Sequence, residues 1–251
     1  MNKRENNWIP VALILILLIL WEVIVRWQQI PLYVLPAPSS VVTALGEEWK
    51  TLAAHGAVTV GEAFLGMGIA LVVALFMGIL MDMFPAVKKG IYPLLIVTQT
   101  VPMIVLAPIL IIYMGFGMAP KILTVVLMCF FPIVVSFTDG MAQLEPGYVN
   151  LVRSYGAKGF EVYRLVKLPA SIPSLLSGLK VAATYSISGA VVGEWIGSQE
   201  GLGYYLLRVK NNYMLDRVFA CVLVIIFLSL CMNGLIKGYQ YFFLSYLSRK
   251  D

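Results

Sequence analysis

The feature that most constrains the fold of this chain is a series of long apolar runs. They fall at about 9–27, 57–82, 91–114, 119–138, 173–197 and 217–243. Each approaches or exceeds the ~20 residues that a helix needs to cross a bilayer, and each is continuous rather than alternating. Only 12% of the residues are charged, against about 25% in a soluble domain. We therefore predict an all-α fold, a polytopic membrane protein with six transmembrane helices.

The first run follows Lys3 and Arg4, as the apolar part of a signal peptide would. It is longer than the usual ~7–15 residues of such a segment, and no convincing A-x-A cleavage site follows it. We therefore expect an uncleaved first span.

The distribution of basic residues predicts the orientation. If the N-terminus is cytoplasmic, twelve of the 18 lysines and arginines lie in inside segments or adjoining span ends, and six lie outside. The positive-inside rule then places both termini and the 143–173 loop in the cytoplasm. The net charge of +5 does not indicate a nucleic-acid partner, because the basic residues are scattered or flank spans, where they face anionic lipid.

The outer connections carry short helical segments. In the 28–56 connection, three prolines predict an extended start, after which Ser39 or Ser40 is expected to cap an amphipathic helix through Leu52. The 198–216 connection is expected to re-enter the outer mouth as a short helix.

The largest polar interval runs from Gln143 to Pro173. Pro146 is suited to the first turn of a helix, and Gly156 is suited to ending it. We predict a second short helix over about 159–167, with Phe160 and Tyr163 on one side. Aromatic side chains flanked by cations suit docking into a groove on a soluble protein, but an amphipathic loop on anionic lipid accounts for the same residues.

Residues of the third and fifth spans are candidates for a solute pathway. Pro102 and Pro108 each remove a helical hydrogen bond and predict kinks, and three polar residues lie beside them: Thr98, Gln99 and Thr100. We favour a pathway over a static kink, because three polar residues would be poorly placed against lipid.

The fifth span carries small residues in two ridges, which include Ser186 and Gly189. Small residues let helices approach closely in lipid, either within one subunit or at a pathway between two. Glu194, near the outer end of this span, is a candidate for the lining of the outer mouth. Nearer the N-terminus, Glu22 and Arg26 are spaced to form an ion pair.

Several kinds of chemistry are not supported by the sequence. The chain contains no Gly-Lys pair and hence no phosphate-binding loop, so any energy from ATP must come from a partner. The three cysteines lie in apolar runs and there is one histidine, so no metal site is predicted. Neither H-E-x-x-H nor G-x-S-x-G is present, and an intramembrane enzyme is disfavoured.

The polar interval resembles the signature of bacterial ABC importer permeases, E-A-A-x-x-x-G-x9-I-x-L-P. Gly156 takes the glycine position, Val166 the isoleucine position, and Leu168-Pro169 match the L-P. The opening triplet is replaced by Asn150-Leu151-Val152. Further likeness lies in L-P-A-P-S-S-V at 35–41, T-Q-T-V-P-M-I-V-L-A-P at 98–108, G-F-G at 115–117 and G-E-W-I-G-S-Q-E-G-L-G-Y-Y at 193–205.

These segments are similar to the branch of the family that imports nitrate, sulfonates, taurine and thiamine-precursor pyrimidines. The resemblance implies a MetI-like permease fold in one transmembrane domain over 1–251, with an extra first helix at about 9–27 and core spans over about 57–243. It implies that the cytoplasmic loop at about 143–173 carries a coupling helix that seats in an ATPase. The contact would be made by Arg153, Ser154, Tyr155, Gly156, Ala157, Lys158, Gly159 and Phe160.

The resemblance also implies partners and a location. These are a second copy of the chain, two cytoplasmic ATPase subunits that bind the ATP and Mg, and an extracytoplasmic solute-binding protein, in a bacterial cell membrane. The chain itself is expected to bind no cofactor. The alternative is a stand-alone secondary transporter driven by an ion gradient, but neither repeated halves nor a carboxylate relay is evident.

Overall fold

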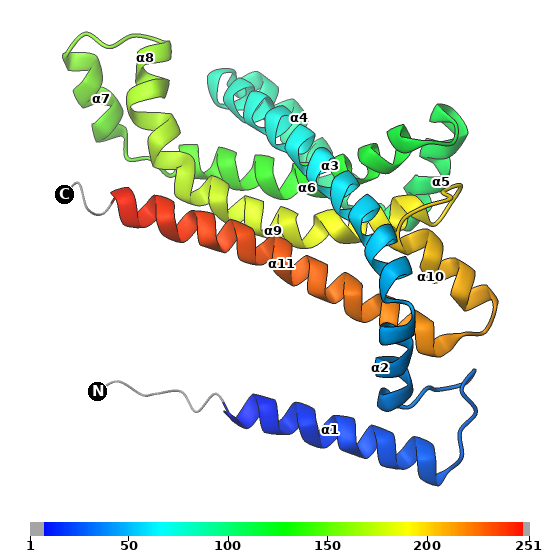
Figure 1. Cartoon of the computed structure of the whole chain (residues 1–251). Coiled ribbons are helices and arrows are strands. Elements are labelled where there is room, and N and C mark those ends of the chain that lie inside the picture. Colours follow the sequence, from blue (N-terminus) through cyan, green and yellow to red (C-terminus); the bar gives the residue numbers. More distant parts are fainter. Residues whose placement is uncertain (1–7, 248–251) are drawn as a thin grey trace.

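Four long helices form the body of the protein. The computed structural model describes residues 8–247, with side chains described as far as Tyr241, and every regular element within that range is helical. The body consists of α3 (Trp49–Met83), α6 (Met118–Ala142), α9 (Leu168–Glu194) and α11 (Leu215–Leu247). Figure 1 shows these helices crossing one another, with α9 between α6 and α11.

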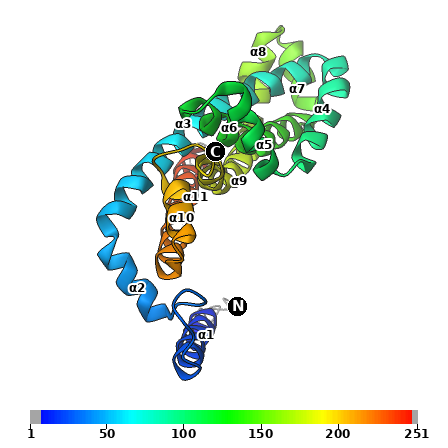
Figure 2. The same cartoon turned by 90° about the vertical axis from the view of Figure 1, so that its right-hand side faces the viewer.

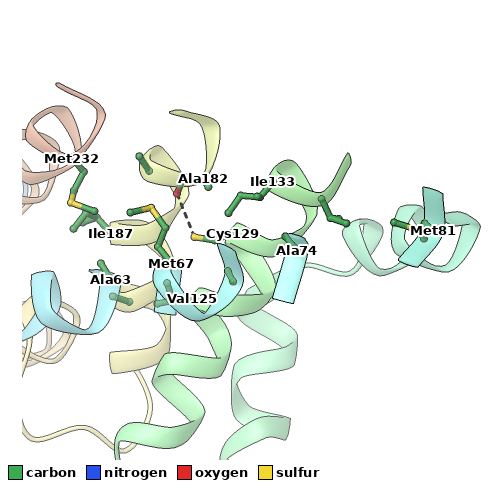
Figure 3. Packing of buried hydrophobic residues seen from close by; sticks show 14 residues of the cluster. Ala63, Met67, Ala74, Met81, Val125, Cys129, Ile133, Ala182, Ile187 and Met232 are labelled. Carbon is green, nitrogen blue, oxygen red and sulfur yellow. Dashed lines mark hydrogen bonds between the residues drawn. The ribbon is translucent and has the colours of Figure 1, made fainter. Parts of the chain in front are cut away.

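The core of this body is made of small and medium apolar side chains. Ala63, Ala70 and Ala74 of α3 meet Val125 and other residues of α6 and α9 in a fully buried cluster. Figure 3 shows this packing, including the hydrogen bond from the Cys129 thiol to the Ala182 carbonyl oxygen. Because lipid is as apolar as these side chains, close backbone approach and van der Waals contact hold the helices together.

Shorter helices lie at the two ends of the body. One end carries α2 (Pro38–Glu47) and α10 (Leu202–Asn211), which share a second buried cluster with α3 and α11. The other carries α7 (Pro146–Ser154), α8 (Phe160–Val162) and the π-helical turn η1 (Tyr163–Lys167). The start of α1 and the end of α11 lie on the same side as α7 (Figure 1).

The first helix, α1 (Trp8–Trp27), stands apart from the body in both views (Figures 1 and 2). Val25 is its single buried residue, and Trp21 meets Phe219 of α11 with ring centroids 5.6 Å apart. The predicted Glu22–Arg26 ion pair is present at 2.5 Å. The Glu22 carboxylate also accepts hydrogen bonds from the backbone and hydroxyl of Ser39.

The prediction for the segment before α3 needs correction. The short helix begins at Pro38 with Ala37 at its N-cap, so neither Ser39 nor Ser40 caps it. Ser39 is instead engaged by Glu22 of α1. The segment through Leu52 is not one helix either, since it divides at Glu48 and its second part is the start of α3.

The third predicted span is also not one helix. It consists of α4 (Pro85–Thr100) and α5 (Met103–Met114), which are bent by 103° across a two-residue break. Val101 and Pro102 are both extended, and Val101 is so because a proline disfavours helical backbone in the residue before it. The helix continues through Pro108, where we had expected a second kink. Within residues 8–247, five helices are thus long and apolar enough to span a membrane, with this bent pair as a sixth candidate.

Candidate functional site

Helix α7, in the 143–173 loop, ends in a complete Schellman motif. The Gly156 N–H donates to the Arg153 carbonyl (2.9 Å) and the Ala157 N–H donates to the Val152 carbonyl (3.1 Å). This motif requires a left-handed residue after the cap, and Gly156 provides it with φ of +94°. At the other end, Pro146 is the first helical residue, as predicted.

The outward face of α7 is apolar and aromatic. Tyr148, Leu151 and Tyr155 follow one another at helical spacing with 58, 55 and 86% exposure, and Phe160 beyond the turn is 74% exposed. Val149 and Val152, which lie on the adjacent side of the helix, are half-buried. Tyr155 therefore belongs to the exposed row.

The return from this loop is fixed to the end of α3. Asp82 accepts a hydrogen bond from the Tyr163 hydroxyl and pairs with the Lys167 ammonium at 2.5 Å. Tyr163 thus contacts α3, whereas Phe160 is exposed. Since η1 continues directly into α9, the Asp82 contacts link the loop mechanically to two helices of the core.

A cavity of about 230 Å³ opens at the break between α4 and α5. It brings together three of the predicted pathway residues, Thr98, Gln99 and Pro102, with Val101, Met103, Met128 and Tyr185. Thr100 is exposed but does not line it, and its hydroxyl donates to the Val97 carbonyl.

Four lining residues were not predicted from the sequence: Val101 and Met103 beside the break, Met128 of α6 and Tyr185 of α9. Tyr185 could have been identified from the sequence as a candidate lining residue, because it is the single aromatic residue of α9. Met128 could not, since methionine within an apolar span is ordinary core composition.

Ser186 and Gly189 lie elsewhere, in the packed interior. Both are buried, the Ser186 hydroxyl donates to the Ala183 carbonyl, and a Cβ on Gly189 would lie 3.1 Å from the Met128 sulfur. The small residues of α9 therefore serve packing against α6 within one subunit. The clearest case is Gly178, where a Cβ would lie 2.6 Å from the Pro132 carbonyl oxygen.

Glu194 is fully buried and does not line an outer mouth. It is one of three side chains that accept hydrogen bonds from three consecutive backbone N–H groups at the start of α10. His55 Nδ1 accepts from Gly201 (3.1 Å), Thr59 Oγ1 from Leu202 (2.9 Å) and Glu194 Oε2 from Gly203 (2.6 Å). The Thr59 hydroxyl in turn donates to Glu194 Oε1 at 2.7 Å.

This arrangement caps α10 with side chains from two other helices, because a helix N-terminus leaves its first N–H groups without partners. It also explains the glycine at 201, whose φ is +100° and whose Cβ would lie 2.2 Å from the Glu194 carboxyl carbon. The conspicuous G-E-W-I-G-S-Q-E-G-L-G-Y-Y segment is thus a structural cap that fixes the 195–203 loop to the core.

A second buried polar contact lies nearby. The Lys121 ammonium of α6 pairs with Glu62 of α3 at 2.5 Å and donates to the Ser198 hydroxyl at 3.2 Å. The 195–203 loop is therefore held by side chains of α3, α6 and α9. Among the described residues, no three histidine, cysteine, aspartate or glutamate side chains gather in a way that could hold a metal ion.

An apolar helical body with several candidate spans, a polar helical excursion at one end and a cavity at a broken helix define a multi-pass membrane transport component. The chain belongs to the family described as the binding-protein-dependent transport system inner membrane component, whose model matches residues 70–240. This confirms the resemblance to ABC importer permeases.

Curated relatives have the same character. The chain is 31% identical to a probable ABC transporter permease protein of Haemophilus influenzae, over 89% of this chain and 91% of that one. It is also 31% identical to the formylaminopyrimidine transport permease protein ThiX of Halalkalibacterium halodurans, over 94% and 95%. The putative aliphatic sulfonates transport permease protein SsuC of Bacillus subtilis is 26% identical, over 89% and 84%.

Solved structures support the MetI-like permease fold. A chain of an amino acid ABC transporter, crystallised with histidines, matches with a TM-score of 0.63 at 17% identity, over 83% of this chain and 98% of that one. A chain of the inward-facing MetNI methionine ABC transporter matches with a TM-score of 0.55 at 16% identity, over 72% and 92%.

Proposed function

We propose that this chain is the transmembrane permease subunit of an ATP-binding-cassette importer. It translocates a small polar solute that an extracytoplasmic binding protein delivers. The solute is of the pyrimidine thiamine-precursor, sulfonate, taurine or nitrate type. Two cytoplasmic ATPase subunits bind ATP and Mg and supply the energy, and the chain itself catalyses no reaction.

The observation that carries this proposal is the exposed row on α7, Tyr148, Leu151 and Tyr155, with Phe160 beyond the turn. Four large apolar side chains outside the core are costly to leave in water, and aromatic anchors of this kind dominate protein interfaces. The Schellman motif holds the row rigidly, so it is prepared to enter a groove on the ATPase. The contact residues are those named from the family signature, 153–160.

The link through Asp82 supports a coupling role for the same loop. A partner that moves α7 also moves η1, and with it Lys167, Asp82 and the end of α3. Nucleotide-driven movement of the ATPase would then favour one of two packed arrangements of the core helices.

A second copy of the chain is proposed to pack against α4. This helix has no buried residue, and the cavity at its end is open on one side. The pathway would lie between two copies, with Thr98, Gln99 and Pro102 facing it. One permease domain over 1–251 is supported by the shared core of α3 to α11.

Both termini are proposed to be cytoplasmic, in a bacterial cell membrane. The count of basic residues supports this orientation, as does the position of the start of α1 and the end of α11 on the α7 side (Figure 1).

The test is co-purification of the tagged chain from gently solubilised membranes, with and without substitutions on α7. We expect a cytoplasmic ATPase to accompany the wild type and to be lost from Tyr155→Ala and Phe160→Ala. Tyr113→Ala is the matched control, since Tyr113 is equally exposed (84%) at the opposite end of the body. A chain that purifies alone and moves solute without ATP would instead establish the ion-coupled secondary transporter.

A further inference from the structure

We propose that the cavity at the α4–α5 break recognises an uncharged, planar nitrogen heteroaromatic solute and excludes simple anions. The inference rests on the proposed function, because it takes this cavity as part of the solute's path. It narrows the solute class from the chemistry of the lining residues.

The cavity lies near the middle of the membrane-spanning body. Met128 is ten residues from the outer end of α6, which at about 1.5 Å per residue is roughly 15 Å of a ~30 Å hydrocarbon core. A break in a helix at this depth is tolerated when its backbone lines a water-filled cavity or is buried in protein.

Two side chains in the cavity offer unused hydrogen-bonding groups. Among the described residues, neither the Gln99 amide nor the Tyr185 hydroxyl has a partner within the protein, whereas the Thr98 hydroxyl donates to the Leu95 carbonyl. Polar groups without partners at membrane depth are costly unless they face water or a solute. Gln99 and Tyr185 are therefore the groups available for recognition.

The lining carries no formal charge. None of the seven residues around the cavity is basic or acidic. An anion such as a sulfonate or nitrate would give up its hydration here without a cation to pair with, which is strongly unfavourable in a low-dielectric site.

The helix ends at the break do not make the cavity more favourable for an anion. The last carbonyls of α4 and the first N–H groups of α5 lie together, so partial charges of both signs are present. A ligand with adjacent donors and acceptors can hydrogen-bond both to the carbonyls of α4 and to the N–H groups of α5, whereas an anion can bond only to the N–H groups.

The remaining side chains favour a flat conjugated ring. The Tyr185 ring is half-exposed, and Met103 and Met128 place thioether sulfurs in the same cavity. Aromatic faces stack on rings, and methionine sulfur makes favourable contacts with them. A glutamine amide can pair with an amino group and the neighbouring ring nitrogen at once, as it does with adenine.

The size of the cavity agrees with this class. A volume of 230 Å³ corresponds to roughly seven or eight water molecules at about 30 Å³ each, enough for one substituted six-membered ring.

The test uses the full chain in lipid nanodiscs and measures saturation transfer to dissolved probes by NMR. The probes are 4-aminopyrimidine, at mildly alkaline pH where it is uncharged, and methanesulfonate. We expect saturation of the pyrimidine and none of methanesulfonate at the same concentration. Tyr185→Leu should weaken pyrimidine binding about ten-fold, since stacking of a base on an aromatic side chain is worth about 1–3 kcal/mol.

Gln99→Leu should weaken pyrimidine binding by a similar factor, because it removes both hydrogen-bonding groups of the amide. Tyr113→Leu is the matched control and should leave binding unchanged, since Tyr113 lies outside the cavity. Gel filtration and thermal melting of each variant establish that it is folded.

Three results would overturn the inference: no pyrimidine binding to the wild type, pyrimidine binding that both substitutions leave unchanged, or methanesulfonate binding that is as strong. The proposed function is judged separately, by ATPase co-purification and ATP-dependent uptake. A chain that couples to an ATPase but fails the probe test retains its function and loses this solute class. A chain that binds the pyrimidine selectively but neither co-purifies with an ATPase nor takes up solute with ATP would support the selectivity of the cavity and contradict the importer assignment.

Discussion

The hydroxyl of Thr59 is expected to control the stability of the loop that leads into α10. Thr59→Val keeps the shape of the side chain but removes an acceptor for the Leu202 N–H and a donor to Glu194. Thr59 and Leu202 are both fully buried, so water cannot replace either bond without opening the structure.

The expected magnitude follows from those two bonds. An ordinary intramolecular hydrogen bond contributes about 0.5–1.5 kcal/mol, and a buried N–H left without an acceptor costs about 1–3 kcal/mol. Because these contributions overlap, we expect a loss of about 2–3 kcal/mol in the free energy of opening the loop. This corresponds to roughly 30- to 150-fold faster amide exchange.

The assay is hydrogen–deuterium exchange by mass spectrometry on the chain in nanodiscs, following the peptide that contains Leu202 and Gly203. Thr124→Val is the matched control. Thr124 is equally buried, but its hydroxyl donates only to the Pro120 carbonyl of its own helix. Equal exchange in wild type and Thr59→Val, or equal acceleration by both substitutions, would refute the capping role.

Three further substitutions test other contacts. Gly178→Ala should destabilise the protein by about 1–3 kcal/mol in thermal melting, because its Cβ would meet the backbone of α6, whereas Gly68→Ala, which faces open space, should be neutral or stabilising. Lys121→Met should cost about 3–5 kcal/mol by leaving the Glu62 charge buried and unpaired, and adding Glu62→Leu should restore most of it in a double-mutant cycle. Asp82→Asn should leave ATPase co-purification intact but lower ATP-dependent uptake several-fold, because it weakens the link between loop and core; unchanged uptake would argue against that link.

Much of the fold was predictable because it depends on local composition. Apolar runs predicted the spans, and Pro146 and Gly156 predicted both ends of α7, since each residue acts through its own backbone. The 103° bend was not predictable. Pro102 indicated a disturbance, but Pro108 carries the same local signal and its helix continues. The difference between the two prolines arises from packing, which a single sequence does not display.

The site was less predictable for a related reason. The polar residues Thr98 and Gln99 were visible as exceptions in an apolar run, but Tyr185 joins them only when α9 folds back. Glu194 was misplaced because its partners, Thr59 and the Gly203 N–H, come from other elements of the chain. A carboxylate near the end of a span looks the same in sequence whether it lines a mouth or caps a neighbouring helix.

The isolation of α1 has a consequence for its tolerance of sequence change. None of its first dozen residues is buried, so any apolar side chain that partitions into lipid should serve there. The last turns are different, because Glu22, Arg26 and Ser39 form one bonded unit that fixes where the helix meets α2. Random substitution within α1 should therefore have two outcomes. Exchanges among apolar residues should be tolerated in its first part, whereas substitutions in its last turns should disrupt the contact with α2.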